Sequence, residues 1–93
     1  MSFFKDLIEK YNRKVEQLFI QHFALNTIIV GIQASDIELI EVGVKHIEKI
    51  VPKNNSAIVK KVLGHGYKNL GAFYMKQNQL EAAQIWFQKA MSL

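Results

Sequence analysis

The chain has 93 residues, a net charge of +4 from 12 basic and 8 acidic side chains, and a hydrophobic fraction of 49%. This length holds one domain at most, at roughly 100–200 residues per domain, and the apolar content excludes intrinsic disorder. The absence of cysteine excludes disulfides, thiolate zinc sites and a cysteine nucleophile. No apolar stretch reaches the ~18–20 residues that a membrane span needs. Because charged residues also interrupt the N-terminus, we expect no signal peptide and a cytoplasmic location.

The first predicted helix covers about residues 3–33. Apolar residues recur there at alternating intervals of four and three, which is the pattern of one helix face. We call this face the long stripe; it consists of Phe4, Ile8, Tyr11, Val15, Leu18, His22, Leu25, Ile29 and Ile32. Two interpretations stay open, because such a stripe either covers neighbours in its own chain or forms a dimerisation surface. We expect His22, its one polar member, to lie in the core or in an interface.

A second helix is predicted over residues 36–51. Ser35 followed by Glu38 forms the Ser-x-x-Glu pattern of a capping box, which would place Ser35 at the N-cap. Pro52 is expected to end this helix, because the residue before proline disfavours the helical conformation. Residues 53–55 then form the predicted turn. The apolar face of this helix is Ile37, Ile40, Val44, Ile47 and Val51.

The third and fourth helices are predicted over residues 56–77 and 80–92. Gly64 and Gly66 lie inside the third helix, where each costs about 1 kcal/mol relative to Ala. We therefore expect close backbone packing or a kink at these two positions. Asn78 is expected to close the third helix, because asparagine tolerates the left-handed conformation of a helix C-terminus.

Two short motifs follow one another in these last two helices. Their residues are Tyr67, Leu70, Gly71 and Tyr74 in the third helix and Ala83, Phe87 and Ala90 in the fourth. In this order they resemble a tetratricopeptide repeat, a helix–turn–helix of ~34 residues with the pattern W-x-x-L-G-x-x-Y followed by A-x-x-x-F. We expect Gly71 to allow close approach of the two helices, with Tyr74 and Phe87 filling the gap between them. Residues 21–52 resemble a second, degenerate repeat.

We expect a single all-α domain over residues 1–93, with a long N-terminal helix and four helices in all. The resemblance implies helix–turn–helix pairs, and the last two helices are expected to form an antiparallel one. The resemblance also implies a non-enzymatic protein–protein interaction module, such as an adaptor, a small chaperone or a regulatory subunit. Repeats of this family bind peptides on the first helix of each pair. The candidate peptide groove is therefore His65, Lys68, Asn69, Ala72, Met75 and Lys76.

Catalytic and cofactor motifs do not occur in the sequence. The segment 64–66 lacks the preceding strand and the third glycine of a phosphate-binding loop. The histidines share no metal-ligand spacing, and the serines stand mostly at predicted helix ends. We therefore expect no enzymatic activity, no cofactor and no metal.

A nucleic-acid-binding regulator is the alternative function. It would use a patch of lysines on the third helix, at Lys60, Lys61 and Lys68, which have no acidic residues close by in the sequence. Mixed charges elsewhere and the absence of a nucleic-acid-binding motif make this the second choice.

Self-association is a further expectation. Stacked repeats bury a continuous core only with about three or more units, and this chain has fewer than two good ones. We expect a homodimer with two-fold symmetry, unless the first helix folds back over Trp86 within one chain. The candidate self-association or partner surface is Phe4, Ile8, Tyr11, Ala82, Ile85, Trp86 and Met91.

Overall fold

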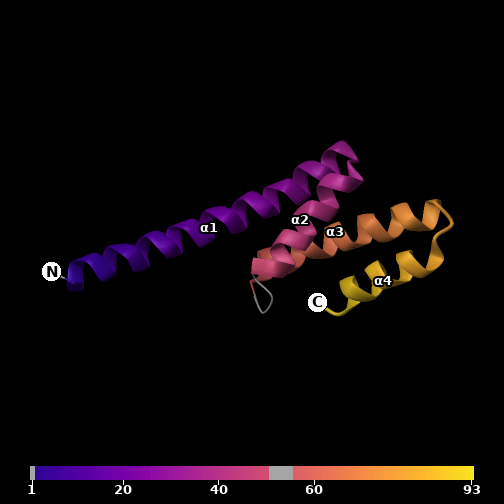
Figure 1. Ribbon diagram of the computed structural model, residues 1–93. Helices are drawn as coiled ribbons and strands as arrows, with labels where there is room; N and C mark the ends of the chain where they lie inside the picture. Colours follow the sequence, from indigo (N-terminus) through magenta and orange to yellow (C-terminus); the bar gives the residue numbers. More distant parts are fainter. Residues whose placement is uncertain (1, 51–55) are drawn as a thin grey trace.

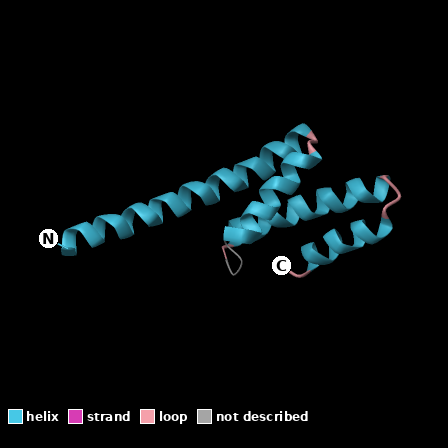
Figure 2. Cartoon of the chain, viewed as in Figure 1, coloured by secondary structure: helices cyan, strands magenta, loops and turns pink. Residues whose placement is uncertain are grey.

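The computed structural model describes residues 2–50 and 56–93; the side chains at 2–4, 7–8, 10–11, 13–19 and 50 lie outside the description. Four α-helices follow in order: α1 (Ser2–Ala34), α2 (Ile37–Ile50), α3 (Ala57–Lys76) and α4 (Leu80–Met91) (Figures 1 and 2). The predicted all-α fold is confirmed, with helix bounds close to the expected ones. The predictions for Pro52 and the turn at 53–55 lie outside the described residues.

The junction between α1 and α2 corrects the predicted capping box. Ser35 has a φ of 54° and belongs to the end of α1, where its N–H donates to the Ile32 carbonyl and the Asp36 N–H donates to the Gly31 carbonyl. This pair of bonds is the Schellman arrangement that closes a helix. Asp36 is the N-cap of α2 instead, since its Oδ1 accepts the Leu39 N–H at 3.1 Å. Ser35 cannot also be the N-cap of α2, because an N-cap residue has an extended backbone whereas Ser35 is in the left-handed conformation.

Two glycines bring α1 and α2 into close contact. A methyl group at Gly31 would lie 2.8 Å from Ile40 Cγ1, and one at Gly43 would lie 2.6 Å from Ile28 Cγ1. Real Cβ contacts are longer than this, so the two helices approach at a distance that only glycine permits. The C-terminal half of α1 and all of α2 thereby form an antiparallel hairpin (Figure 1).

Helix α3 packs over one face of this hairpin and completes the core. Gly66 is the close-contact position, since a methyl group there would lie 3.0 Å from Val44 Cγ2 and 3.2 Å from Ile28 Cγ2. The close packing expected at this glycine is confirmed, whereas Gly64 has ordinary space. The buried core consists of Ala24, Leu25, Ile28, Ile40, Val44, Ile47, Val59, Leu63, Tyr67 and Leu70.

Helices α3 and α4 form a second hairpin. The turn begins at Asn78, whose φ of 62° confirms the expected left-handed end of the third helix. A methyl group at Gly71 would lie 2.9 Å from the Phe87 ring, so this glycine allows close approach as predicted. The Tyr74 hydroxyl donates a hydrogen bond to Glu41, so this side chain also connects α3 to α2.

The N-terminal half of α1 projects away from the other three helices (Figure 1). The chain is 61 Å long and has a radius of gyration of 16.2 Å, whereas a compact domain of this size has about 12 Å. About 28 Å of helix, residues 2–20 at ~1.5 Å per residue, therefore extends beyond the two hairpins. None of the described helices is long and apolar enough to cross a membrane.

Candidate functional site

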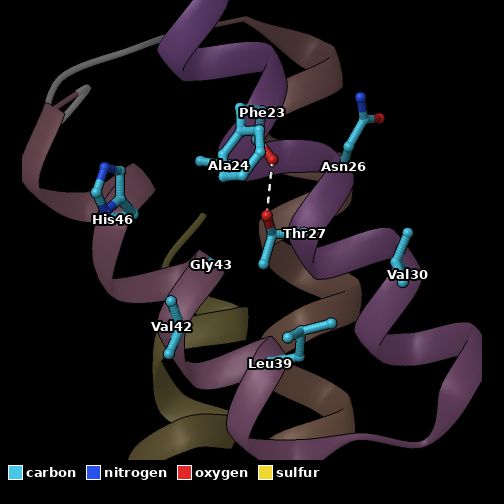
Figure 3. Close-up of a pocket in the computed structure, with 9 residues that line it drawn as sticks. All are labelled: Phe23, Ala24, Asn26, Thr27, Val30, Leu39, Val42, Gly43 and His46. Atoms are coloured by element: carbon cyan, nitrogen blue, oxygen red, sulfur yellow. Dashed lines mark hydrogen bonds between the residues drawn. The ribbon is translucent and has the colours of Figure 1, made fainter.

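An apolar groove lies on the face of the α1·α2 hairpin, and we call it the α1–α2 groove. Its volume is about 490 Å³. Figure 3 shows its side chains, which come from these two helices alone. They are Phe23, Ala24, Asn26, Thr27, Val30, Leu39, Val42, Gly43 and His46.

The floor of the α1–α2 groove follows from the close helix crossing. Gly43 has no side chain, and a methyl group there would also lie 3.1 Å from the Ala24 carbonyl oxygen. Large apolar side chains rise on both sides of this floor. Phe23 is 66% exposed, Val30 51% and Val42 60%. The combination of a flat floor and apolar walls is the shape that a ridge of side chains on another helix fills.

The polar side chains that line the groove are those of Asn26, Thr27 and His46. The Thr27 hydroxyl donates to the Phe23 carbonyl oxygen at 2.8 Å, one helical turn earlier (Figure 3). Asn26 and His46 are exposed. The lining of the groove is therefore mainly apolar.

Sequence reasoning missed most of this groove. Phe23 and Val30 lie beside the long stripe, so the sequence pattern shows them only as a wider apolar face of α1. Leu39 and Val42 lie off the core face of α2, so the apolar spacing of that helix does not include them. Gly43 was the one available signal, since a glycine inside a helix marks a place of close packing.

A smaller hollow of about 250 Å³ lies between α1 and α3, and we call it the α1–α3 hollow. It is lined by Ile29, Ile32, Gln33, Val62 and His65. Of the six residues predicted for a peptide groove, His65 lines this hollow, and its carbonyl accepts a hydrogen bond from Asn69 Nδ2 at 2.8 Å. The other predicted residues continue along α3: Lys68, Ala72, Met75 and Lys76 are exposed, and Asn69 is half-buried.

The residues of the predicted self-association surface differ in their exposure to solvent. Ile85 is 55% exposed and Met91 80% exposed, whereas Ala82 and Trp86 are half-buried. Phe4, Ile8 and Tyr11 belong to α1, and their side chains lie outside the described residues. His22 is exposed, so the prediction of a core position for it is wrong and the interface prediction stays open.

Trp86 belongs to a cluster that joins α2, α3 and α4. Its ring centroid lies 5.9 Å from that of Tyr67 on α3 and 4.8 Å from Lys89 Nζ. Glu48 on α2 connects the group, because its Oε2 accepts the Tyr67 hydroxyl at 2.5 Å and Lys89 Nζ at 3.1 Å. Burial, together with the hydrogen bond to the Glu48 carboxylate, raises the pKa of Tyr67 well above its ordinary value. Trp86 thus has a structural role within one chain.

The predicted lysine patch is accessible. Lys60, Lys61 and Lys68 are all exposed on α3. Lys61 and Lys68 are seven residues apart, so they share one face of the helix.

Comparison with known proteins adds no assignment: no family model, curated protein or solved structure matches the chain.

Proposed function

We propose that this protein is a non-enzymatic protein–protein interaction module, serving as an adaptor, a small chaperone or a regulatory subunit. The observation that carries the proposal is the α1–α2 groove, with its exposed apolar walls at Phe23, Val30 and Val42. A set of large apolar side chains gathered on one surface usually marks an interaction site.

The occupant that fits this groove is an amphipathic helix of a partner protein. The hairpin of α1 and α2 already binds a helix on another face, where α3 packs with Gly66 against Ile28 and Val44. The α1–α2 groove offers the same kind of surface, a small-residue floor between apolar ridges. A partner helix with apolar residues at spacings of three and four would cover it.

Two point variants test this function. Val42→Asp places a charge in the groove, whereas Leu80→Asp places one at an equally exposed apolar position on α4, since Val42 is 60% and Leu80 62% exposed. Each variant and the natural chain are used to capture partners from the native source. We expect a protein that the natural chain and Leu80→Asp retain and that Val42→Asp loses. Cross-linking then identifies the bound segment, which must carry a helical apolar face.

Other outcomes contradict the groove assignment. A partner retained by Val42→Asp but lost by Ala72→Arg would move the site to the predicted peptide groove on α3. Capture that none of these variants affects would overturn both sites.

The alternative function is nucleic-acid binding through Lys60, Lys61 and Lys68, whose exposure makes the patch accessible. DNA or RNA binding that falls steeply with salt would favour it, because phosphate contacts release counterions. Binding to a protein that depends little on salt would favour the interaction module.

We also propose that the chain self-associates as a homodimer. The support is the projecting half of α1, which carries Phe4, Ile8, Tyr11, Val15 and Leu18 of the long stripe. An apolar helix face of this length is rarely left open to water.

A further inference from the structure

Helix α2 carries charged side chains along two of its edges, and one edge already holds α3. The Tyr67 hydroxyl of α3 donates to Glu48 at 2.5 Å, and the Tyr74 hydroxyl donates to Glu41. The two tyrosines are seven residues apart, and so are the two glutamates, so both bonds lie along one line between the helices. Helix α2 thus binds a neighbouring helix through apolar contacts in the middle and polar contacts at the edge.

The second charged edge of α2 borders the α1–α2 groove. Val42, Lys45 and Lys49 follow one another at spacings of three and four, which places them on one side of the helix. Val42 is a wall of the groove, so the two lysines continue this wall toward the C-terminal end of α2. Both lysines are exposed. Among the described residues they form no ion pair, whereas Glu48 is already paired with Lys89.

The α1 side of the groove provides no formal charge. Residues 17–34 contain no Asp, Glu, Lys or Arg. Phe23 and His46 lie at one end of the groove and Leu39 at the other (Figure 3). The two lysines flank His46 in the sequence, whereas the exposed Glu38 precedes Leu39. The charge beside the groove therefore changes from basic at the Phe23 end to acidic at the Leu39 end.

We propose that the partner helix of the α1–α2 groove carries two carboxylates, one helical turn apart, that pair with Lys45 and Lys49. This inference rests on the proposed function and identifies the partner as an acidic amphipathic helix. Its apolar stripe covers the Gly43 floor between Phe23 and Val42. Its acidic edge lies over the last turns of α2, as the polar edge of α3 lies over the opposite side of that helix. Side chains three or four apart on a helix match two lysines that are four apart.

Glu38 determines the direction of the bound helix. It lies seven residues before Lys45, which is about two helical turns. A carboxylate placed beside Glu38 would be repelled, and like charges across an interface exclude incorrect arrangements. The acidic residues of the partner therefore lie at one end of its apolar stripe rather than along the whole helix.

Two synthetic peptides test this charge preference. Both are alanine-based helices with leucines at spacings of three and four and a fluorescent label. Beside one end of the leucine stripe, the first carries two glutamates four residues apart, and the second carries lysines at the same positions. Fluorescence anisotropy measures the dissociation constant of each. We expect the glutamate peptide to bind the natural chain roughly tenfold more tightly, since it gains two exposed ion pairs where the other has two repulsions. The preference should shrink at high salt, which screens exposed charges.

Charge reversal on α2 provides the matching variant. Lys45→Glu combined with Lys49→Glu should reverse the preference, so that the lysine peptide binds more tightly. The control is Lys60→Glu combined with Lys61→Glu, because these lysines of α3 are also exposed. Each substitution removes two units of charge, so both double variants lower the net charge from +4 to 0. We expect the control to keep the preference for the glutamate peptide. Circular dichroism verifies that the helices of each variant are intact.

The outcomes separate this inference from the proposed function. Equal binding of the two peptides, lost in both cases on Val42→Asp, would overturn the charge assignment and leave the groove as the binding site. Peptide binding that Val42→Asp does not affect would overturn the groove as well. If neither peptide binds the natural chain, the inference is wrong, whereas partner capture with Val42→Asp decides the proposed function independently.

Discussion

Several glycines of this protein lie where two helices touch. The effect of adding a side chain at each one depends on the atoms that it would meet. At Gly43 the nearest atoms include backbone, with the Ile28 nitrogen 3.0 Å and the Ala24 oxygen 3.1 Å from an added methyl group. Backbone cannot move aside as a flexible side chain does. At Gly64 the nearest atom is Leu93 Cδ1 at 3.6 Å, an ordinary contact.

The two glycines are therefore expected to respond to alanine in opposite directions. Gly43→Ala should lower the free energy of unfolding by about 1–3 kcal/mol through overpacking. Gly64→Ala should raise it by about 0.5–1 kcal/mol, because alanine favours the helix and meets no obstacle. Urea unfolding followed by circular dichroism measures both. Equal effects of the two substitutions would show that the α1·α2 crossing is not as close as described.

Tyr67 connects the core to the polar cluster around Glu48. Folding raises its pKa above the ordinary 10.0, through burial first and then through the hydrogen bond to Glu48. The folded protein thus holds the phenol proton more tightly than the unfolded chain does. The stabilisation from this group is complete below pH 10 and falls as the pH rises beyond it.

Tyr67→Phe tests this dependence. Below pH 10 the substitution should lower the free energy of unfolding by about 1–2 kcal/mol, since it removes a hydrogen bond to a carboxylate. The difference from the natural chain should shrink above pH 10, where the tyrosine loses its advantage. Thermal unfolding at a series of pH values from neutral to 12 measures it. A difference that stays constant across this range would argue against the raised pKa.

Ser35 and Asp36 are neighbours at the junction of α1 and α2, but they have different roles there. Ser35 and Asp36 are both good N-cap residues, and the Ser-x-x-Glu pattern favours the first. The structure assigns Ser35 to the left-handed end of α1 and Asp36 to the start of α2. The choice depends on the whole turn, which closes α1 before α2 begins.

Alanine at these two positions distinguishes the alternatives. Asp36→Ala should lower the free energy of unfolding by about 1 kcal/mol, because it removes the acceptor for the Leu39 N–H. Ser35→Ala should be nearly neutral, since the Ser35 side chain does not cap α2. Denaturant unfolding of both variants decides the matter; the reverse order of effects would restore the capping box.

The helices themselves were predictable from local signals, because apolar spacing and Asn78 act within a few residues. The buried positions of α2 and α3 were predictable for the same reason. The α1–α2 groove was not, since Phe23 and Val42 become neighbours only through the crossing at Gly43. Trp86 was expected on a surface, but its ring packs beside Tyr67 of α3, whose hydroxyl in turn donates to Glu48 of α2. Contacts that join three elements leave no local pattern.

Taken as a whole, these four helices form an unusually open structure for 93 residues, with a length of 61 Å. Its two hairpins form a core around α3, while the first half of α1 stands apart (Figure 1). The sequence of this half carries the first five members of the long stripe, and the proposed homodimer would give them a partner in a second copy. The proposed partner helix would likewise cover the exposed walls of the α1–α2 groove.

The molar mass in solution tests this view most directly. Light scattering after gel filtration is applied to the natural chain alone, over micromolar concentrations. We predict a mass of twice the 10.7 kDa of one chain, as the proposed homodimer requires. A mass of 10.7 kDa across this range, with the helices intact by circular dichroism, would contradict the account.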